Sequence, residues 1–128
     1  MTLDLKILVW VVALTFVEVV AAALASMGQV GLPMLAGNRE GMPPLTGLAG
    51  RARRAHLNML ESLPLFIGLV LIAHIAGKVN DTVMLGCQLF FWGRVAHWLL
   101  YLAGIPWVRT VAWAVSVVGL ILLFIQLV

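Results

Sequence analysis

Four apolar stretches, each long enough to cross a lipid bilayer, occupy most of this chain. A membrane-spanning helix needs about 20 mostly apolar residues, and four windows reach that length, at about 5–30, 54–77, 81–103 and 106–128. The segments between them are short or rich in glycine and proline, which indicates turns and a loop. The pattern predicts an all-α integral membrane protein, with a four-transmembrane-helix bundle as a single domain over residues 1–128.

The composition indicates that little of the chain lies outside the membrane. Hydrophobic residues make up 63% of the 128 residues and charged residues only 10%, against about 25% charged residues in a soluble domain. The net charge of +3 bears on orientation and on anionic lipid rather than on nucleic acid. The single cysteine, Cys87, excludes an intrachain disulfide framework and a thiolate cluster. We therefore expect no metal site and no nucleic-acid partner.

The first apolar stretch contains ALA at 23–25, which resembles a signal-peptidase site. A signal peptide has a net positive n-region and an apolar core of about 7–15 residues. Here Asp4 cancels Lys6, and the apolar run extends from about Ile7 to Val30. We therefore expect this segment to be the first span rather than a cleaved leader.

Basic residues in the short loops predict the orientation, because cytoplasmic loops carry an excess of lysine and arginine. The first loop and its edge carry Arg39, Arg51, Arg53 and Arg54. The second loop has only Lys78 and the N-terminal segment only Lys6, while Arg109 lies just past the third loop. Both termini should therefore lie on the non-cytoplasmic side, with the first and third loops in the cytoplasm.

Polar residues at the start of the second predicted helix share one face. At 100° per residue, Arg54, Asn58 and Glu61 align along the helix, while His56 points away towards another helix or subunit. Glu61 lies about 10 Å beyond Arg54 along the helix axis. A charge at that depth is costly unless it is paired, which makes it a functional hypothesis by default.

The third predicted helix carries a matching face of Arg94, His97 and Tyr101. Arg94 lies about 14 Å from the cytoplasmic end of that helix, a depth similar to that of Glu61. We therefore predict a Glu61–Arg94 ion pair, with Asn58 and His97 hydrogen-bonded around it. The alternative is that the pair only locks the two helices together.

Arg109 lies in the first turn of the fourth predicted helix, which Pro106 begins. The helix dipole is already positive there, so a cation is unfavourable for the helix itself. Together with the free backbone N–H groups and the hydroxyl of Thr110, Arg109 predicts an anion-binding site. The alternative is an anchor that contacts lipid phosphate.

Three further residues carry weaker signals. Glu18 lies mid-span in the first helix and needs a partner, which could be Asn58, Arg94 or another subunit. His74 lies near the outer end of the second helix, where we expect the membrane interface. Cys87 is expected to contribute to packing rather than to act as a nucleophile.

Three motifs in the last three predicted helices resemble the MAPEG family, the membrane-associated proteins in eicosanoid and glutathione metabolism. They are RRAHLNMLESLPLF (53–66), GRVAHWLLYLAGIP (93–106) and WVRTVAW (107–113). The loop text from GNRE to RRAHLN is similar to that of the smaller bacterial members. The resemblance implies a homotrimer in the bacterial inner membrane, with a cytoplasmic site between neighbouring subunits. Glutathione would bind there as co-substrate, and a hydrophobic acceptor would enter from the membrane.

The resemblance also implies roles for particular side chains. Two groups would contact glutathione or brace its site: Arg54, Asn58 and Glu61 from the second helix, and Arg94, His97 and Tyr101 from the third. Arg109 matches the family arginine proposed to stabilise the glutathione thiolate, and His56 would act structurally. Two positions depart from the family pattern. MGQVGLPM at the end of the first helix lacks a cation, and Trp113 replaces a frequent tyrosine.

The expected chemistry is attack by a glutathione thiolate on a hydrophobic electrophile, or reduction of a lipid hydroperoxide. A cation and a helix N-terminus make a thiol of pKa about 8.5 nucleophilic by stabilising its thiolate, and Arg109 lies where both are present. A non-catalytic lipid-binding or scaffold protein on the same fold is the main alternative. A small proton-coupled transporter using Glu18 is disfavoured, because it does not explain the polar faces of the second and third helices.

Overall fold

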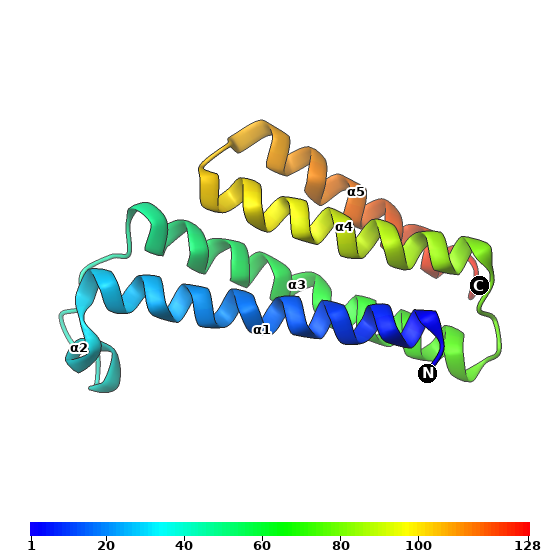
Figure 1. The fold of residues 1–128 in the computed structure, drawn as a ribbon, viewed down its shortest axis with the longest axis horizontal. Helices are drawn as coiled ribbons and strands as arrows, with labels where there is room; N and C mark the ends of the chain where they lie inside the picture. Colours follow the sequence, from blue (N-terminus) through cyan, green and yellow to red (C-terminus); the bar gives the residue numbers. More distant parts are fainter.

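In the computed structural model, which describes residues 1–128, the chain is all helical. Four of its helices are long and apolar enough to cross a membrane (Figure 1). This confirms the predicted all-α fold with four transmembrane helices and makes the chain a multi-pass integral membrane protein. The helices are α1 (Leu3–Val30), α2 (Leu32–Ala36), α3 (Gly47–Ile75), α4 (Asp81–Ala103) and α5 (Pro106–Ile125).

Helices α3 and α4 form the centre of the bundle. Helix α1 packs against α3 and α4, helix α5 packs against α4 and α3, and α1 and α5 do not touch. Figure 1 shows the N-terminus and the C-terminus at the same end of the bundle. The connections 31–46 and 104–105 lie at the opposite end, which we call the loop end. That this end faces the cytoplasm stays a prediction.

The connection between α1 and α3 is more ordered than the loop predicted between the first two spans. It contains the short helix α2, and α3 begins at Gly47 rather than at residue 54. The apolar window that predicted this span begins later than the helix, because the basic residues before the window still favour a helix. The loop folds back on α1 through Gln29, which donates to the Pro44 carbonyl (3.0 Å) and accepts from the Thr46 N–H (2.9 Å).

Helices α4 and α5 approach closely because small residues face each other. A Cβ atom on Gly119 would lie 2.6 Å from the carbonyl oxygen of Gly86. On Gly93 it would lie 2.9 Å from the backbone nitrogen of Ser116. Small residues permit such backbone contact between membrane helices. This seam fixes α5, and the residues at its start, against α4.

Most side chains face outward from the protomer. Only 26 of the 128 residues are buried, and every long helix exposes large apolar side chains. Such a surface suits lipid or partner helices rather than water. The core includes the stacked rings of Phe66 and Phe90, whose centroids are 4.2 Å apart between α3 and α4.

A polar contact closes the end of the bundle that carries the termini. Asp4 is 1% exposed, and its Oδ2 lies 2.8 Å from Nδ1 of His74. His74, predicted at the membrane interface, therefore joins the end of α3 to the start of α1.

Candidate functional site

Arg94 is the centre of the polar residues inside the bundle. It lies on the buried stripe of α4 and is 0% exposed. Its Nη1 donates a hydrogen bond of 2.9 Å to Oδ1 of Asn58 on α3. A hydrogen bond that involves a charged group is stronger than a neutral one, particularly in a low-dielectric interior. The bond therefore joins the two central helices at a position that the sequence marked as functional.

Tyr101 and Arg109 meet where α4 turns into α5. Gly104 ends α4 at φ 77°, a left-handed conformation that suits glycine, and Pro106 begins α5. This short turn places the guanidinium of the half-buried Arg109 over Tyr101, with Cζ 4.1 Å from the ring centroid. The His97 ring meets Tyr101 edge-on, with the centroids 5.5 Å apart. The turn thus joins a cation on α5 to the aromatic rings of α4.

Part of the predicted site forms two groups of contacting side chains, Asn58 with Arg94, and His97 and Arg109 with Tyr101. We call these five residues the site cluster. All of them are buried or half-buried. The cluster extends from the middle of the α3–α4 interface to the loop end, and every member can form hydrogen bonds.

Three predicted site residues lie outside the cluster. Arg54 is exposed, and its Nη1 folds back beside Gly50. Thr110 is exposed, and its hydroxyl donates to the Pro106 carbonyl of its own helix at 3.4 Å. Glu61 is also exposed. Within one protomer these side chains do not face the cluster.

The predicted Glu61–Arg94 ion pair is wrong, since Arg94 bonds to Asn58 and no ion pair joins it to Glu61. The reason is the direction in which α3 faces its neighbours. Its buried stripe includes Met59, which is 0% exposed. At 100° per residue Asn58 lies about 100° from Met59, whereas Glu61 lies about 160° away. Asn58, at the edge of the polar face, is therefore the residue of that face that bonds to α4.

The sequence analysis gave little weight to Glu18 and His56 as functional candidates. Glu18 is 0% exposed on α1, and its Oε2 lies 4.0 Å from Nδ1 of His56 on α3. The prediction that His56 points to another helix is confirmed. The signal for Glu18 was its spacing, because it belongs to a stripe of every third or fourth residue that α1 buries. That stripe is Asp4, Ile7, Val11, Thr15, Glu18, Ala22 and Ser26.

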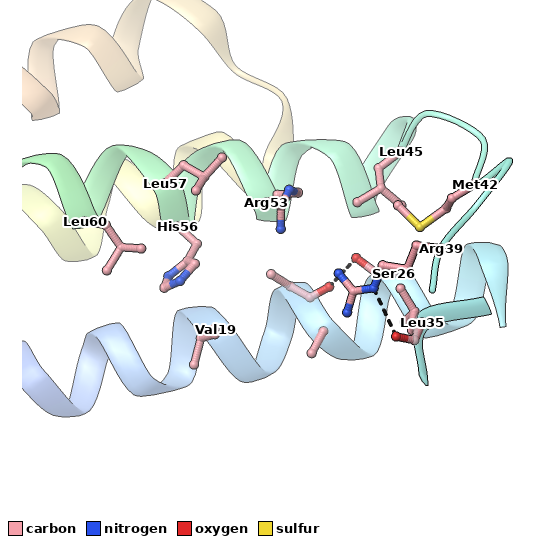
Figure 2. A pocket seen from close by; sticks show the side chains of 12 residues that line it. Val19, Ser26, Leu35, Arg39, Met42, Leu45, Arg53, His56, Leu57 and Leu60 are labelled. Carbon is pink, nitrogen blue, oxygen red and sulfur yellow. Dashed lines mark hydrogen bonds between the residues drawn. The ribbon is translucent and has the colours of Figure 1, made fainter. Parts of the chain in front are cut away.

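A groove of about 400 Å³ runs between α1, the loop and the first turns of α3. Figure 2 shows Arg53 and His56 pointing from α3 towards α1, with Arg39 at the loop end of the groove. Arg39 is held there by its Nε, which donates to the Leu35 carbonyl at 3.0 Å. The remaining lining is mostly apolar. The loop therefore brings a cation beside the end of α1, where MGQVGLPM has none.

The loop end is cationic and its arginines are not neutralised by acids. Only two carboxylate contacts of basic side chains form in the protomer, and both involve histidine. Arg51 has a structural role, because its Nε donates to the Leu102 carbonyl (3.1 Å) and joins α3 to the end of α4. The other arginines at this end are free to attract an anionic ligand or lipid phosphate.

The fold and the site cluster define a four-helix membrane protein with a cationic polar cluster between its helices. The sequence model of the MAPEG family matches residues 6–128. The chain therefore belongs to the MAPEG family, which confirms the resemblance seen in the motifs.

Three relatives are similar to part of the chain. Microsomal glutathione S-transferase 1 of Homo sapiens and of Sus scrofa are each 39% identical to the chain over 56 residues. The protein of the same name from Rattus norvegicus is 36% identical over 56 residues. In each case the match covers 44% of this chain and only 36% of the relative. No solved structure matches the chain significantly.

Proposed function

We propose that this protein is a membrane-bound, glutathione-dependent transferase or peroxidase acting on hydrophobic electrophiles or lipid hydroperoxides. Membership of the MAPEG family and similarity to microsomal glutathione S-transferases support a glutathione-related function in a membrane. The observation that carries the proposal is the position of Arg109. It lies in the first turn of α5, 4.1 Å over the ring of Tyr101, and no carboxylate pairs with it.

Arg109 would stabilise the glutathione thiolate. The thiolate is the nucleophilic form of a thiol, and a nearby cation and helix N-terminus favour it. In transfer, the thiolate sulfur forms a bond to the electrophilic carbon, and the leaving group departs with its electron pair. In peroxide reduction, two glutathione molecules reduce one hydroperoxide to an alcohol and water and become a disulfide. Cys87 is 0% exposed, so the chain itself presents no thiol for this step.

The other predicted site residues suit the rest of the tripeptide. Asn58 is half-buried and Arg54 and Glu61 are exposed along one face of α3. Arg54 would bind a glutathione carboxylate, Glu61 its ammonium group and Asn58 a carbonyl oxygen. Arg94, His97, Tyr101 and Thr110 would brace this arrangement from α4 and α5.

The exposed charges on α3 support a site shared between subunits. Glu61 lies about 10 Å along the helix from Arg54, and an uncovered carboxylate at that depth is costly against lipid. A neighbouring copy of the chain would cover it. The proposed assembly is the homotrimer that the MAPEG resemblance implies, in a bacterial inner membrane. The arginines at its loop end favour the cytoplasmic side for that end.

The ultraviolet absorbance of thiolate tests the role of Arg109. Mixing the purified protein with glutathione near neutral pH should produce a thiolate signal, and Arg109→Ala should remove most of it. One lost hydrogen bond or contact to a charged group corresponds to about ten- to hundredfold in the thiolate equilibrium. Arg109→Lys keeps the charge and should retain part of the signal.

Lys6→Ala is the matched control, since it removes one exposed cation at the other end of the bundle. It should leave the thiolate signal unchanged. Absence of a signal in the unmodified protein, or an undiminished signal in Arg109→Ala, would contradict the catalytic role.

The groove of Figure 2 favours a second candidate function, binding of an anionic lipid without catalysis. Its polar lining includes Arg39 and Arg53 towards the loop end, while His56, Leu57 and Leu60 line the groove further along α3. This distribution of basic and apolar side chains along the groove suits an amphiphile whose anionic head lies at the interface and whose chain lies in the hydrocarbon layer.

Native mass spectrometry with oleate or phosphatidylglycerol distinguishes this function from the first. Arg53→Gln should weaken lipid binding about fivefold, because one basic side chain contributes about 1 kcal/mol near an anionic surface. The same variant should leave the glutathione thiolate signal intact, and Arg109→Ala should show the reverse pattern. Equal lipid binding by Arg53→Gln and the unmodified protein would exclude the groove as the lipid site.

A further inference from the structure

Arg51 joins two helices at the loop end and has no role in the proposed chemistry. It lies near the start of α3 and is half-buried, and its Nε donates to the Leu102 carbonyl in the last turn of α4 at 3.1 Å. Only two side-chain hydrogen bonds join α3 to α4, and the other one, from Arg94 to Asn58, lies deeper in the bundle. The Arg51–Leu102 bond therefore fixes α3 to α4 at the loop end.

The turn after α4 explains why the Leu102 carbonyl accepts a bond from a side chain. In a continuing helix this carbonyl would accept from the N–H group of residue 106, but Pro106 has none. The preceding carbonyl, of Tyr101, instead accepts from the Gly104 N–H at 3.0 Å as the chain turns. The guanidinium of Arg51 thus supplies a donor that the backbone cannot provide.

Arg51 also packs against the turn itself. A Cβ atom on Gly104 would lie 3.7 Å from both Cδ and Nε of Arg51. A cation at this point is favourable, because the helix dipole is negative at the C-terminal end of α4. Hydrogen bond, contact and dipole therefore all hold Arg51 where α4 turns into α5.

The Arg51–Leu102 bond connects two parts of the proposed glutathione site. Arg54 and Asn58, which would bind the tripeptide, follow Arg51 on α3 by about one and two helical turns. Arg109, which would stabilise the thiolate, lies beyond the turn in the first turn of α5. The close seam between α4 and α5 fixes Arg109 relative to α4. The bond from Arg51 then fixes this end of both helices relative to α3.

We propose that Arg51 is a positioning residue, which holds Arg109 at the distance from α3 that the thiol of bound glutathione requires. It acts through the Leu102 carbonyl and the turn, and it does not contact the ligand. The inference rests on the proposed function, because it assigns a task to Arg51 at the same site.

This role separates thiolate formation from binding. Without the bond, the turn can move away from α3, and Arg109 moves with it. Glutathione held by Arg54, Asn58 and Glu61 would then still bind, but its thiol would no longer lie beside the cation. A merely structural role of Arg51 would lower the stability of the protein without changing the thiolate equilibrium of the folded protein.

Arg51→Met tests the proposal, since it removes the donor and the charge but keeps an unbranched side chain. In the full-length protein at saturating glutathione, the ratio of thiolate to thiol should fall about three- to tenfold, the range of a typical hydrogen bond. The affinity for S-methylglutathione, which has no ionisable thiol, should stay unchanged in calorimetric titration. Arg51→Lys keeps the charge and a donor and should restore part of the thiolate ratio.

Arg51→Met combined with Arg109→Ala tests whether Arg51 acts through Arg109. The double variant should have about the same thiolate ratio as Arg109→Ala alone, because no cation is then left to position. Thiolate absorbance measured as a function of pH gives this ratio even where the signal at neutral pH is small.

Hydrogen exchange followed by mass spectrometry tests the Arg51–Leu102 bond without glutathione. The N–H groups of Gly104 and Ile105 should exchange about three- to tenfold faster in Arg51→Met, because the turn opens more often. Lys78→Met is the matched control, since Nζ of Lys78 donates to the Leu127 carbonyl at 3.4 Å at the other end of the bundle (Figure 1). It should change neither the exchange at the turn nor the thiolate ratio.

Four results would overturn the proposal. They are an undiminished thiolate ratio in Arg51→Met, unchanged exchange at the turn, a further loss of thiolate in the double variant, and weaker binding of S-methylglutathione, which would make Arg51 a direct ligand. If Arg51→Met does not fold, Arg51→Gln carries the same measurements. Failure of the proposed function looks different, because the unmodified protein would then form no thiolate, while exchange at the turn would still be faster in Arg51→Met.

Discussion

Replacement of Arg94 by methionine is expected to lower the free energy of unfolding by about 1.5–3 kcal/mol, the value of a hydrogen bond to a charged group. Arg94 is the largest of the fully buried side chains. Its loss leaves Oδ1 of Asn58 without its donor. Denaturant titration of the protein in detergent micelles, followed by circular dichroism, measures this change.

A matched variant shows whether the loss comes from the buried hydrogen bond. Arg109→Met makes the same substitution at a half-buried position and should cost only about 0.5–1 kcal/mol, the value of an exposed cation–π contact. An Arg94→Met variant as stable as the unmodified protein would show that the hydrogen bond between Arg94 and Asn58 adds no stability.

Replacement of Gly119 by valine is expected to separate α4 from α5. The added Cβ would lie 2.6 Å from the Gly86 carbonyl oxygen and 2.8 Å from the Phe90 backbone nitrogen. Both atoms belong to the backbone of α4, so neither can move without shifting the helix. Overpacking of this kind costs about 1–3 kcal/mol or more, and the same denaturant titration would detect it.

The Gly119 variant should also affect the site, because α5 carries Arg109 to Tyr101. We expect a reduced thiolate signal together with the reduced stability. Gly68→Val is the matched control, since Gly68 is helical in α3 and a Cβ there meets nothing within 4 Å. If Gly119→Val and Gly68→Val behave alike, the close α4–α5 seam does not form in the membrane.

Much of the fold was predictable because hydrophobic length is a strong constraint on a membrane chain. The four apolar windows correspond to four long helices, and the turn before Pro106 lies where the sequence placed it. The start of α3 was missed. Its first turns, from Gly47, carry arginines that are compatible with a helix but not with the apolar window that defined the span.

The site was only partly predictable from helical periodicity. The spacing of Arg94, His97 and Tyr101 correctly grouped three side chains, because residues three or four apart share a helix face. Helical periodicity could not show which edge of the polar face of α3 contacts α4. The sequence predicted Glu61 as the ion-pair partner of Arg94, with Asn58 beside it, but only Asn58 bonds to Arg94 in the structure.

The sequence by itself determined the membrane-spanning class, the order of the helices and the position of Arg109 at a helix N-terminus, because these depend on local composition and on Pro106. Only the tertiary structure decided the partners of the buried charges. Glu18 had several possible partners along the chain, and the packing of α1 against α3 brings its Oε2 to 4.0 Å from Nδ1 of His56. The rotation of each helix about its axis sets such choices, and it depends on how whole surfaces fit together rather than on any single motif.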